Sequence, residues 1–294
     1  MRKVNCAIAL ALLFWASAFV GIRFSLESYT PGALALLRFI IASICMGIIY
    51  LRLPNKNKMP WLIRIQLLLI GVGAIGIYNI CLNTGELTIS ASIASFIIGI
   101  NPVLTILLSI ILFKERTHFG IWLGVGISMF GLLLMALGGK NTAIHIEGVL
   151  IIFVATIMSA IYNLTQGLFL KTYHPIVVTS WVIWGGTLFL SYFIFDLKQE
   201  FFKASYEATF VVIYMGIFSA ALAYLCWSYV LANMPVSRAS IYSYALPLYS
   251  TALGFLFLGE KPSAMSFAGG VIALAGAFIA KQPQRSLATT AVLR

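Results

Sequence analysis

Polar side chains recur at helical spacing inside one long apolar stretch, residues 148 to 169. Ser159, Tyr162, Asn163 and Gln166 are separated by three or four residues, so a helix places them on one face. Hydroxyl and amide groups bind a small solute by hydrogen bonds. Because polar groups are costly in apolar surroundings, they should face a cavity or a neighbouring helix. We predict that Tyr162, Asn163 and Gln166 line a binding cavity; the alternative is that they hold helices together.

Two other stretches carry a proline at matching places. Their helical stripes are Ser92, Ser95, Gly99 and Pro102 in the first, and Ser237, Ser240, Tyr244 and Pro247 in the second. Since a proline removes one helical hydrogen bond, Pro102 and Pro247 are predicted as hinges or gates. Ser95 and Tyr244 are predicted to contact a ligand. Small residues on such stripes also suit plain close packing, which remains an alternative.

Aromatic and amide side chains stand at equivalent depths of two further stretches. Tyr78 and Asn79 belong to residues 64 to 83, Tyr224 and Trp227 to residues 208 to 231, and Trp15 to residues 6 to 24. Together they are predicted to form an aromatic cavity with hydrogen-bonding tips. Such walls stack on an aromatic group or hold a cation over a ring face, at about 0.5–2 kcal/mol each. The alternative is that these rings face lipid or form interfacial belts.

Charge is nearly absent from the apolar stretches. Arg38 is the one cation set well inside a stretch, where it attracts an anionic group or turns outward and braces the structure. The acidic residues all fall at or near the ends of stretches, so no buried carboxylate is expected; Glu86 is the best placed if protons are coupled. Glu115 and Glu260 are predicted to cap helix N-termini.

Catalytic parts are missing from the sequence. The three histidines, His118, His145 and His174, lie between apolar stretches, and there is no HExxH, GxSxG or intramembrane aspartate pair. We therefore expect no enzyme, no metal site and no cofactor. The cysteines have no CxxC spacing and are interpreted as small buried hydrophobic residues; they are Cys6, Cys45, Cys81 and Cys226.

Composition explains what must position these side chains. The chain is 61% hydrophobic and 9% charged, against about 45–50% and about 25% in soluble domains. A spanning helix needs roughly 20 apolar residues. The apolar stretches are residues 6 to 24, 33 to 51, 64 to 83, 91 to 113, 119 to 138, 148 to 169, 177 to 195, 208 to 231, 238 to 258 and 264 to 280. The sequence predicts an all-α integral membrane protein with ten transmembrane helices.

Lysine and arginine set the expected orientation. With a cytoplasmic N-terminus, thirteen of them fall on the cytoplasmic side and five on the other, so both termini are predicted to be cytoplasmic. The net charge of +11 is thereby a topology signal, with membrane lipids as partners and no nucleic acid. Met1-Arg2-Lys3 and Ala16-Ser17-Ala18 imitate a signal peptide, but we expect this segment to remain as the first helix. Monomer and homodimer both stay open.

The sequence indicates two copies of a five-helix unit. A shift of 145 residues superposes Ser95 on Ser240 and Pro102 on Pro247, and Glu115 meets Glu260. We predict a first repeat at 1–138, a linker at 139–147, a second repeat at 148–280 and a cytoplasmic tail at 281–294. Because five is odd, the second repeat is inverted, which is typical of alternating-access carriers with a binding site between the halves.

Three motifs carry a resemblance to a known family. They are Phe14-Trp15-Ala16-Ser17-Ala18-Phe19 with Leu37-Arg38-Phe39; Asn101-Pro102-Val103 through Phe113-Lys114-Glu115-Arg116 to Gly124 and Gly131; and Leu246-Pro247-Leu248 through Leu258-Gly259-Glu260-Lys261. On these residues the chain resembles the ten-helix EamA-like branch of the drug/metabolite transporter superfamily. The likeness extends from about residue 6 to 280.

The resemblance implies a central cavity between helices 1, 3, 4, 6, 8 and 9, with helices 5 and 10 at the back. Family members export amino acids, drugs or other metabolites, and relatives exchange nucleotide sugars or phosphorylated sugars. We therefore expect an inner-membrane exporter of small metabolites, amino acids or related zwitterionic or cationic compounds. The alternatives are a proton-coupled multidrug or choline-like transporter, and a non-transporting receptor or scaffold.

Overall fold

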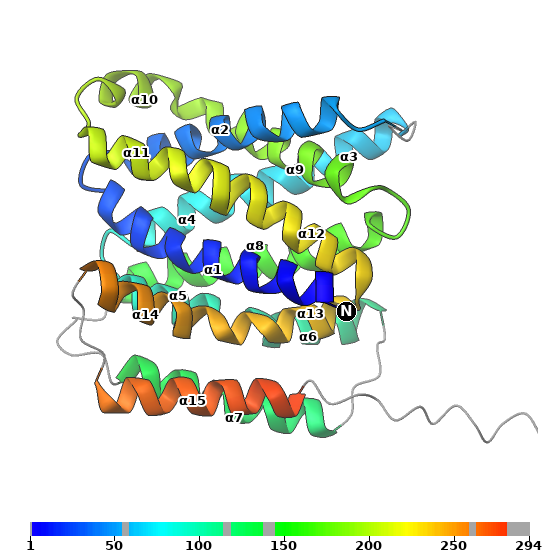
Figure 1. Ribbon diagram of the computed structural model, residues 1–294, viewed down its shortest axis with the longest axis vertical. Helices are drawn as coiled ribbons and strands as arrows, with labels where there is room; N and C mark the ends of the chain where they lie inside the picture. The colour runs from blue at the N-terminus through cyan, green and yellow to red at the C-terminus, as the bar shows by residue number, and fades with distance from the viewer. Residues whose placement is uncertain (1, 55–58, 114–118, 138–144, 259–262, 281–294) are drawn as a thin grey trace, which may run out of the picture.

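The computed structural model describes residues 2–54, 59–113, 119–137, 145–258 and 263–280, and every regular element within them is helical (Figure 1). In the first half, the helices join end to end into five rods: α1 (Arg2–Ser25); α2 (Pro31–Leu51); α3 (Trp61–Gly71), η1 (Val72–Ile77) and α4 (Tyr78–Gly85); α5 (Ala91–Ile98) and α6 (Asn101–Phe113); and α7 (Phe119–Leu137).

The second half repeats this order. Its five rods are α8 (Ile146–Phe169); α9 (Pro175–Leu190), η2 (Ser191–Phe193) and α10 (Ile194–Phe201); α11 (Tyr206–Tyr214), η3 (Met215–Leu222) and α12 (Ala223–Asn233); α13 (Val236–Ser240), η4 (Ile241–Ala245) and α14 (Leu246–Leu258); and α15 (Ala264–Ala280). The predicted ten-helix fold is confirmed.

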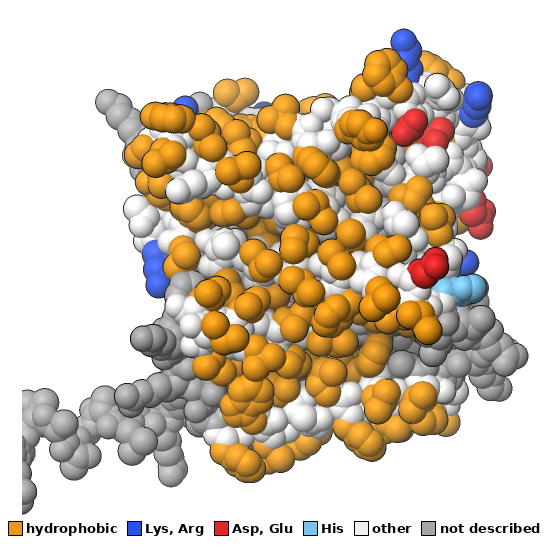
Figure 2. Space-filling model, turned by 180° about the vertical axis from the view of Figure 1, so that it is seen from behind, with side chains coloured by type: hydrophobic (Ala, Val, Ile, Leu, Met, Phe, Trp, Pro, Cys, Tyr) orange, Lys and Arg blue, Asp and Glu red, His pale blue; other side chains and the backbone are white. Residues whose placement is uncertain are grey.

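The bundle is built to lie in a bilayer. Within the described residues, seven rods are long and apolar enough to cross a membrane, and two shorter apolar helices lie in Phe119–Leu134 and Phe267–Ala280. Hydrophobic side chains cover the middle of the face in Figure 2, while charged side chains gather toward its two ends. The protein is therefore a multi-pass integral membrane protein.

Each half packs on the other in matched pairs of helices. α1 contacts α12 and α14 of the second half, and the equivalent helix α8 contacts α4 and α6 of the first. Likewise α2 packs on η3, and α9 packs on η1. Exchanging the halves leaves these neighbours the same, as two inverted repeats require. The start of α1 and the end of α15 lie at the same end of the bundle (Figure 1).

Helices α7 and α15 pack against each other at one side of the bundle (Figure 1). A Cβ added at Gly124 would stand 2.5 Å from the carbonyl oxygen of Gly276, and one added at Gly131 would meet the backbone of Gly269 and Ala273. Since glycine leaves no side chain between the backbones, the helices approach closely. The Ser128 hydroxyl also donates to the Ala273 carbonyl at 2.9 Å.

The cysteines are less buried than expected: Cys6 is exposed, and the other three are partly exposed while they pack against the hydrophobic core. Glu115, Glu260 and the 281–294 tail lie outside the described residues.

The contact between α7 and α15 gives a prediction. Gly131→Ala should destabilise the protein by about 1–3 kcal/mol, because the new methyl group overpacks a backbone contact. Gly126→Ala, in the same helix with nothing within 4 Å of its added Cβ, is the matched control. Thermal unfolding in detergent measures both. Equal melting temperatures for the two variants would contradict this packing.

Candidate functional site

The prolines mark places where two rods are interrupted. α5 ends at Ile98, and α6 begins again at Asn101 with Pro102 as its second residue. In the other half, the 3-10 segment η4 precedes α14, which again has a proline, Pro247, as its second residue. Proline is tolerated in a first helical turn, where its missing N–H is not needed. The helices thus stop and restart instead of bending at the proline.

A cavity lies beside these interruptions, between the two repeats. Its empty volume is about 680 Å³, counting the part open to the outside. It is lined by Trp15, Ala18, Phe19, Arg38, Ala74, Tyr78, Leu82, Ile98, Asn101, Ser159, Tyr162, Asn163, Tyr224, Trp227, Ser243 and Leu246. These residues come from rods 1, 2, 3, 4, 6, 8 and 9. Arg38 therefore adds the second rod to the six that the family resemblance implies.

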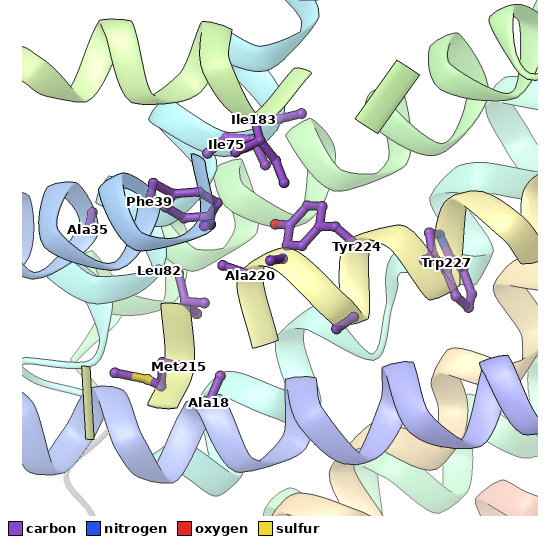
Figure 3. Close-up of a cluster of buried hydrophobic side chains, with 14 of the residues drawn as sticks. Ala18, Ala35, Phe39, Ile75, Leu82, Ile183, Met215, Ala220, Tyr224 and Trp227 are labelled. Carbon is purple, nitrogen blue, oxygen red and sulfur yellow. The ribbon is translucent and has the colours of Figure 1, made fainter. Parts of the chain in front are cut away.

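Aromatic rings form one wall of the cavity. Trp15 of α1 lies 5.5 Å from Tyr224 and 5.3 Å from Trp227, measured between ring centroids, and Tyr162 lies 5.9 Å from Tyr224. Figure 3 shows Tyr224 and Trp227 on α12, with Tyr224 directed toward Phe39 of α2. The predicted aromatic cluster is thus assembled from both repeats.

Amide groups continue this wall through hydrogen bonds. The Trp227 indole donates to Asn163 Oδ1 at 2.9 Å, and Asn163 Nδ2 donates to Asn101 Oδ1 at 3.1 Å. Thr105 donates to the same Asn101 oxygen at 3.1 Å. Asn101 Nδ2 is buried and has no partner. In the side chain of Asn101, the amide oxygen therefore already accepts hydrogen bonds, while the amide N–H group has no partner.

Four predicted site residues lie next to the cavity without lining it. Gln166 donates to Ser228 at 2.6 Å, and Ser250 donates to Ser95 at 2.7 Å. Tyr244 packs in a separate hydrophobic cluster, and Asn79 is turned toward Arg38. Gln166 thus joins helices, and Ser95 and Tyr244 pack between them, which are the alternatives that the sequence left open for these three residues.

Arg38 is buried and ties the two repeats together. Its side chain is 3% exposed, so it does not turn outward to the membrane surface. It donates to Asn79 Oδ1 at 3.2 Å and to Ser219 Oγ at 2.9 Å. Asn79 itself donates to the Ile75 carbonyl at 2.8 Å, and Ser219 to the Met215 carbonyl at 2.8 Å. Those two carbonyls belong to η1 and η3.

η1 and η3 are π-helical and occupy equivalent places in the two repeats. Each is followed directly by a helix whose first turn faces the cavity, with Tyr78 in one case and Tyr224 in the other. Single π-helical turns inside longer helices are frequent at functional sites. Apolar periodicity does not distinguish a π-helical segment from an α-helix, so these segments could not be predicted from the sequence.

Glu86 corrects the expectation that no carboxylate is buried. It follows α4 directly and is 0% exposed, because the end of α4 is covered by α8 and by Arg23 of α1, which donates to the Glu86 backbone carbonyl. Both of its carboxylate oxygens lack hydrogen-bond partners. Burial raises the pKa of the Glu86 carboxyl well above its ordinary value, against the opposing charges of Arg23 and Arg38.

Sequence reasoning missed Asn101, Ser243 and Leu246 as cavity residues. Asn101 and Leu246 stand next to the motif prolines, and a polar residue at a helix restart was the signal that would have found Asn101. Ser159, on the polar face of the sixth rod, does line the cavity.

Comparisons with known proteins agree with this arrangement. The model of the EamA-like transporter family matches residues 2–137 and again residues 146–281. The chain is 34% identical to "Uncharacterized transporter YdfC" of Bacillus subtilis (strain 168), over 94% of this chain and 91% of that protein.

Two more distant relatives have more specific names. A "Probable terminal-alkyne amino-acid exporter" of Streptantibioticus cattleyicolor is 27% identical, covering 95% of this chain and 93% of that protein. A "Probable amino-acid metabolite efflux pump" of Salmonella typhimurium is 22% identical, covering 95% and 94%. One solved crystal structure superposes with a TM-score of 0.75 at 18% identity, covering 95% of this chain and 96% of that one, which shows the fold.

The burial of Glu86 predicts a pH-dependent stability. Because its folded pKa lies above the unfolded value of about 4.3, the folded state binds the extra proton and loses that stabilisation as pH rises. Glu86→Gln cannot titrate, so it should gain stability relative to wild type above about pH 4.5, by at most about 1.4 kcal/mol per pH unit.

Thermal unfolding across pH measures this difference. Glu207→Gln, which changes an exposed acid at the start of α11, is the control and should follow the wild-type curve. If the Glu86→Gln and wild-type curves run parallel at every pH, the burial of this carboxyl is wrong.

Proposed function

The chain belongs to the EamA-like transporter family, and from that premise we propose that it exports small metabolites, amino acids or related zwitterionic or cationic compounds, by alternating access. The observation that carries this proposal is the cavity, which takes its lining from both repeats. Any movement of one repeat against the other changes the access to such a cavity.

Irregular backbone at the cavity supports a moving site. In carriers with inverted repeats, interrupted helices near the membrane centre place backbone groups at the substrate. Here the interruptions before Pro102 and Pro247 adjoin Asn101 and Leu246, which line the cavity. We take Pro102 and Pro247 as the hinges of this movement.

The cavity wall suits small organic solutes with polar ends. Trp15, Tyr224 and Trp227 offer ring faces and edges, while Asn101 and Asn163 offer amide groups. Such a mixture fits an amino acid with an apolar or aromatic side chain. The names of the two distant relatives point to the same class of cargo.

The excess of Lys and Arg on one side supports a cell-membrane protein with both termini in the cytoplasm. We keep 1–138 and 148–280 as its two repeats, joined by a linker at 139–147. A small-molecule substrate and membrane lipids are its proposed partners.

A second candidate, a proton-coupled carrier of multidrug or quaternary-ammonium type, is favoured by one observation. Tyr78 and Leu82 lie on one face of α4 and line the cavity, and Glu86 follows the helix four residues after Leu82. A buried carboxyl one turn beyond the cavity wall is placed to carry a proton.

Asn163 offers a direct test of the proposed site. Asn163→Ala removes the acceptor of the Trp227 indole and one donor to Asn101, so it should weaken amino-acid export about tenfold or more, since a buried unpaired group costs about 1–3 kcal/mol. Efflux of labelled L-amino acids from liposomes measures this.

Thr165→Ala is the matched control on the same helix, because its hydroxyl bonds only within α8, to the Ile161 and Tyr162 carbonyls. If the Asn163→Ala variant folds and exports amino acids at the wild-type rate, the cavity is not the substrate-binding site.

A further inference from the structure

We propose that the cavity selects substrates that bear a carboxylate, and that Arg38 is the residue that binds it, with Asn101 as a second donor. This inference rests on the proposed function, because it specifies the cargo of the same cavity. It excludes compounds whose only charge is a cation.

Arg38 places an uncompensated positive charge at the cavity. Among the residues that the structure describes, Arg38 is the one charged side chain that lines the cavity, and the groups it bonds, Asn79 and Ser219, are neutral. Its Nε has no partner. A buried cation without a counter-ion is costly, so an anion that enters the cavity gains an attraction that is weakly screened there.

Glu86 does not take this place. It acts on Arg38 through space, but both of its carboxylate oxygens are without hydrogen-bond partners, so the two side chains form no ion pair. Burial also raises the pKa of the Glu86 carboxyl, which favours its uncharged form. The counter-ion of Arg38 is then left to the cargo.

Asn101 adds a second hydrogen-bond donor that favours an anionic ligand. Its oxygen already accepts from Asn163 and Thr105, so only its Nδ2 is left for a ligand, and Nδ2 can only donate. Arg38 Nε and Asn101 Nδ2 are both buried, so a solute contacts them only when the two side chains move. Arg38 and Asn101 both offer hydrogen-bond donors, and a carboxylate presents two acceptor oxygens.

The rest of the cavity wall favours a singly charged anion with an apolar or aromatic part. The other charged side chains in this region, Arg23 and Glu86, do not line the cavity. A monovalent carboxylate neutralises the single guanidinium, whereas a doubly charged phosphate leaves one buried negative charge unpaired. The rings of Trp15, Tyr224 and Trp227 leave an apolar or aromatic surface for the rest of the molecule. A positive amino group then lies against a ring face.

Matched ligands test the proposal on the wild-type protein. L-phenylalanine, 3-phenylpropanoate and phenethylamine share one ring and differ in their charged groups; L-alanine, propionate and ethylamine form the same series at smaller size. Thermal shift of the detergent-purified protein measures apparent affinity. We expect the carboxylates of at least one series to bind at least tenfold more tightly than the matching amine.

Two outcomes overturn the proposal: an amine that binds as tightly as its carboxylate partners, or no binding by any carboxylate of either series. If an amine binds as tightly as its carboxylate partners and crosses liposome membranes, transport stands and carboxylate selection fails. If a carboxylate binds through Arg38 but is not transported, selection stands and the proposed export function fails.

Variants locate the effect. Arg38→Gln should lose the preference for carboxylates, and Arg38→Lys, which keeps the charge and is the variant to use if glutamine prevents folding, should reduce it about tenfold. Arg23→Gln removes a positive charge from the same region, where Arg23 bonds only backbone carbonyls of Glu86 and Leu87, and should keep the preference. A preference that survives both Arg38 variants overturns the assignment.

Discussion

A single arginine held inside an apolar bundle is the constraint on which the site depends. Lipid offers Arg38 no partner, so the protein must supply neutral groups from within, and it takes one from each repeat, Asn79 and Ser219. Those two groups are in turn bonded to carbonyls of the π-helical segments. One buried charge thus links the irregular parts of both halves and leaves a positive potential at the cavity.

The same solvent rule explains where the backbone is irregular. Inside a bilayer, a helix can be interrupted only where protein or a cavity satisfies the freed groups. The interrupted rods here meet at the centre of the bundle, where Thr156, for example, donates to the Ile97 carbonyl at 3.3 Å. At the side of the bundle, α7 and α15 remain unbroken and pack through glycines. The α7–α15 pair therefore supports the bundle from the side, and the site combines interrupted rods with the unbroken helices α1, α2 and α8.

Much of the fold could be predicted from the sequence. The length of the apolar stretches indicates helices that cross a membrane, and the 145-residue shift indicates two repeats. Rings at equivalent depths, such as Tyr78 and Tyr224, were placed at the cavity by the same reasoning. Which amides face the cavity could not be read: Asn79 and Gln166 bond neighbouring helices, whereas Asn101 lines the cavity. Glu86 was misjudged because a position at a helix end does not show what covers it.

The central claim is that one cavity between the repeats is reached in turn from the two sides of the membrane. Ser159 lines that cavity, so Ser159→Cys in a variant without the native cysteines tests the claim directly. The measurement is its labelling by a membrane-impermeant thiol reagent applied to one side of sealed vesicles at a time. We predict labelling from each side, reduced by bound cargo. Labelling from one side alone, or from neither, would contradict alternating access to this cavity.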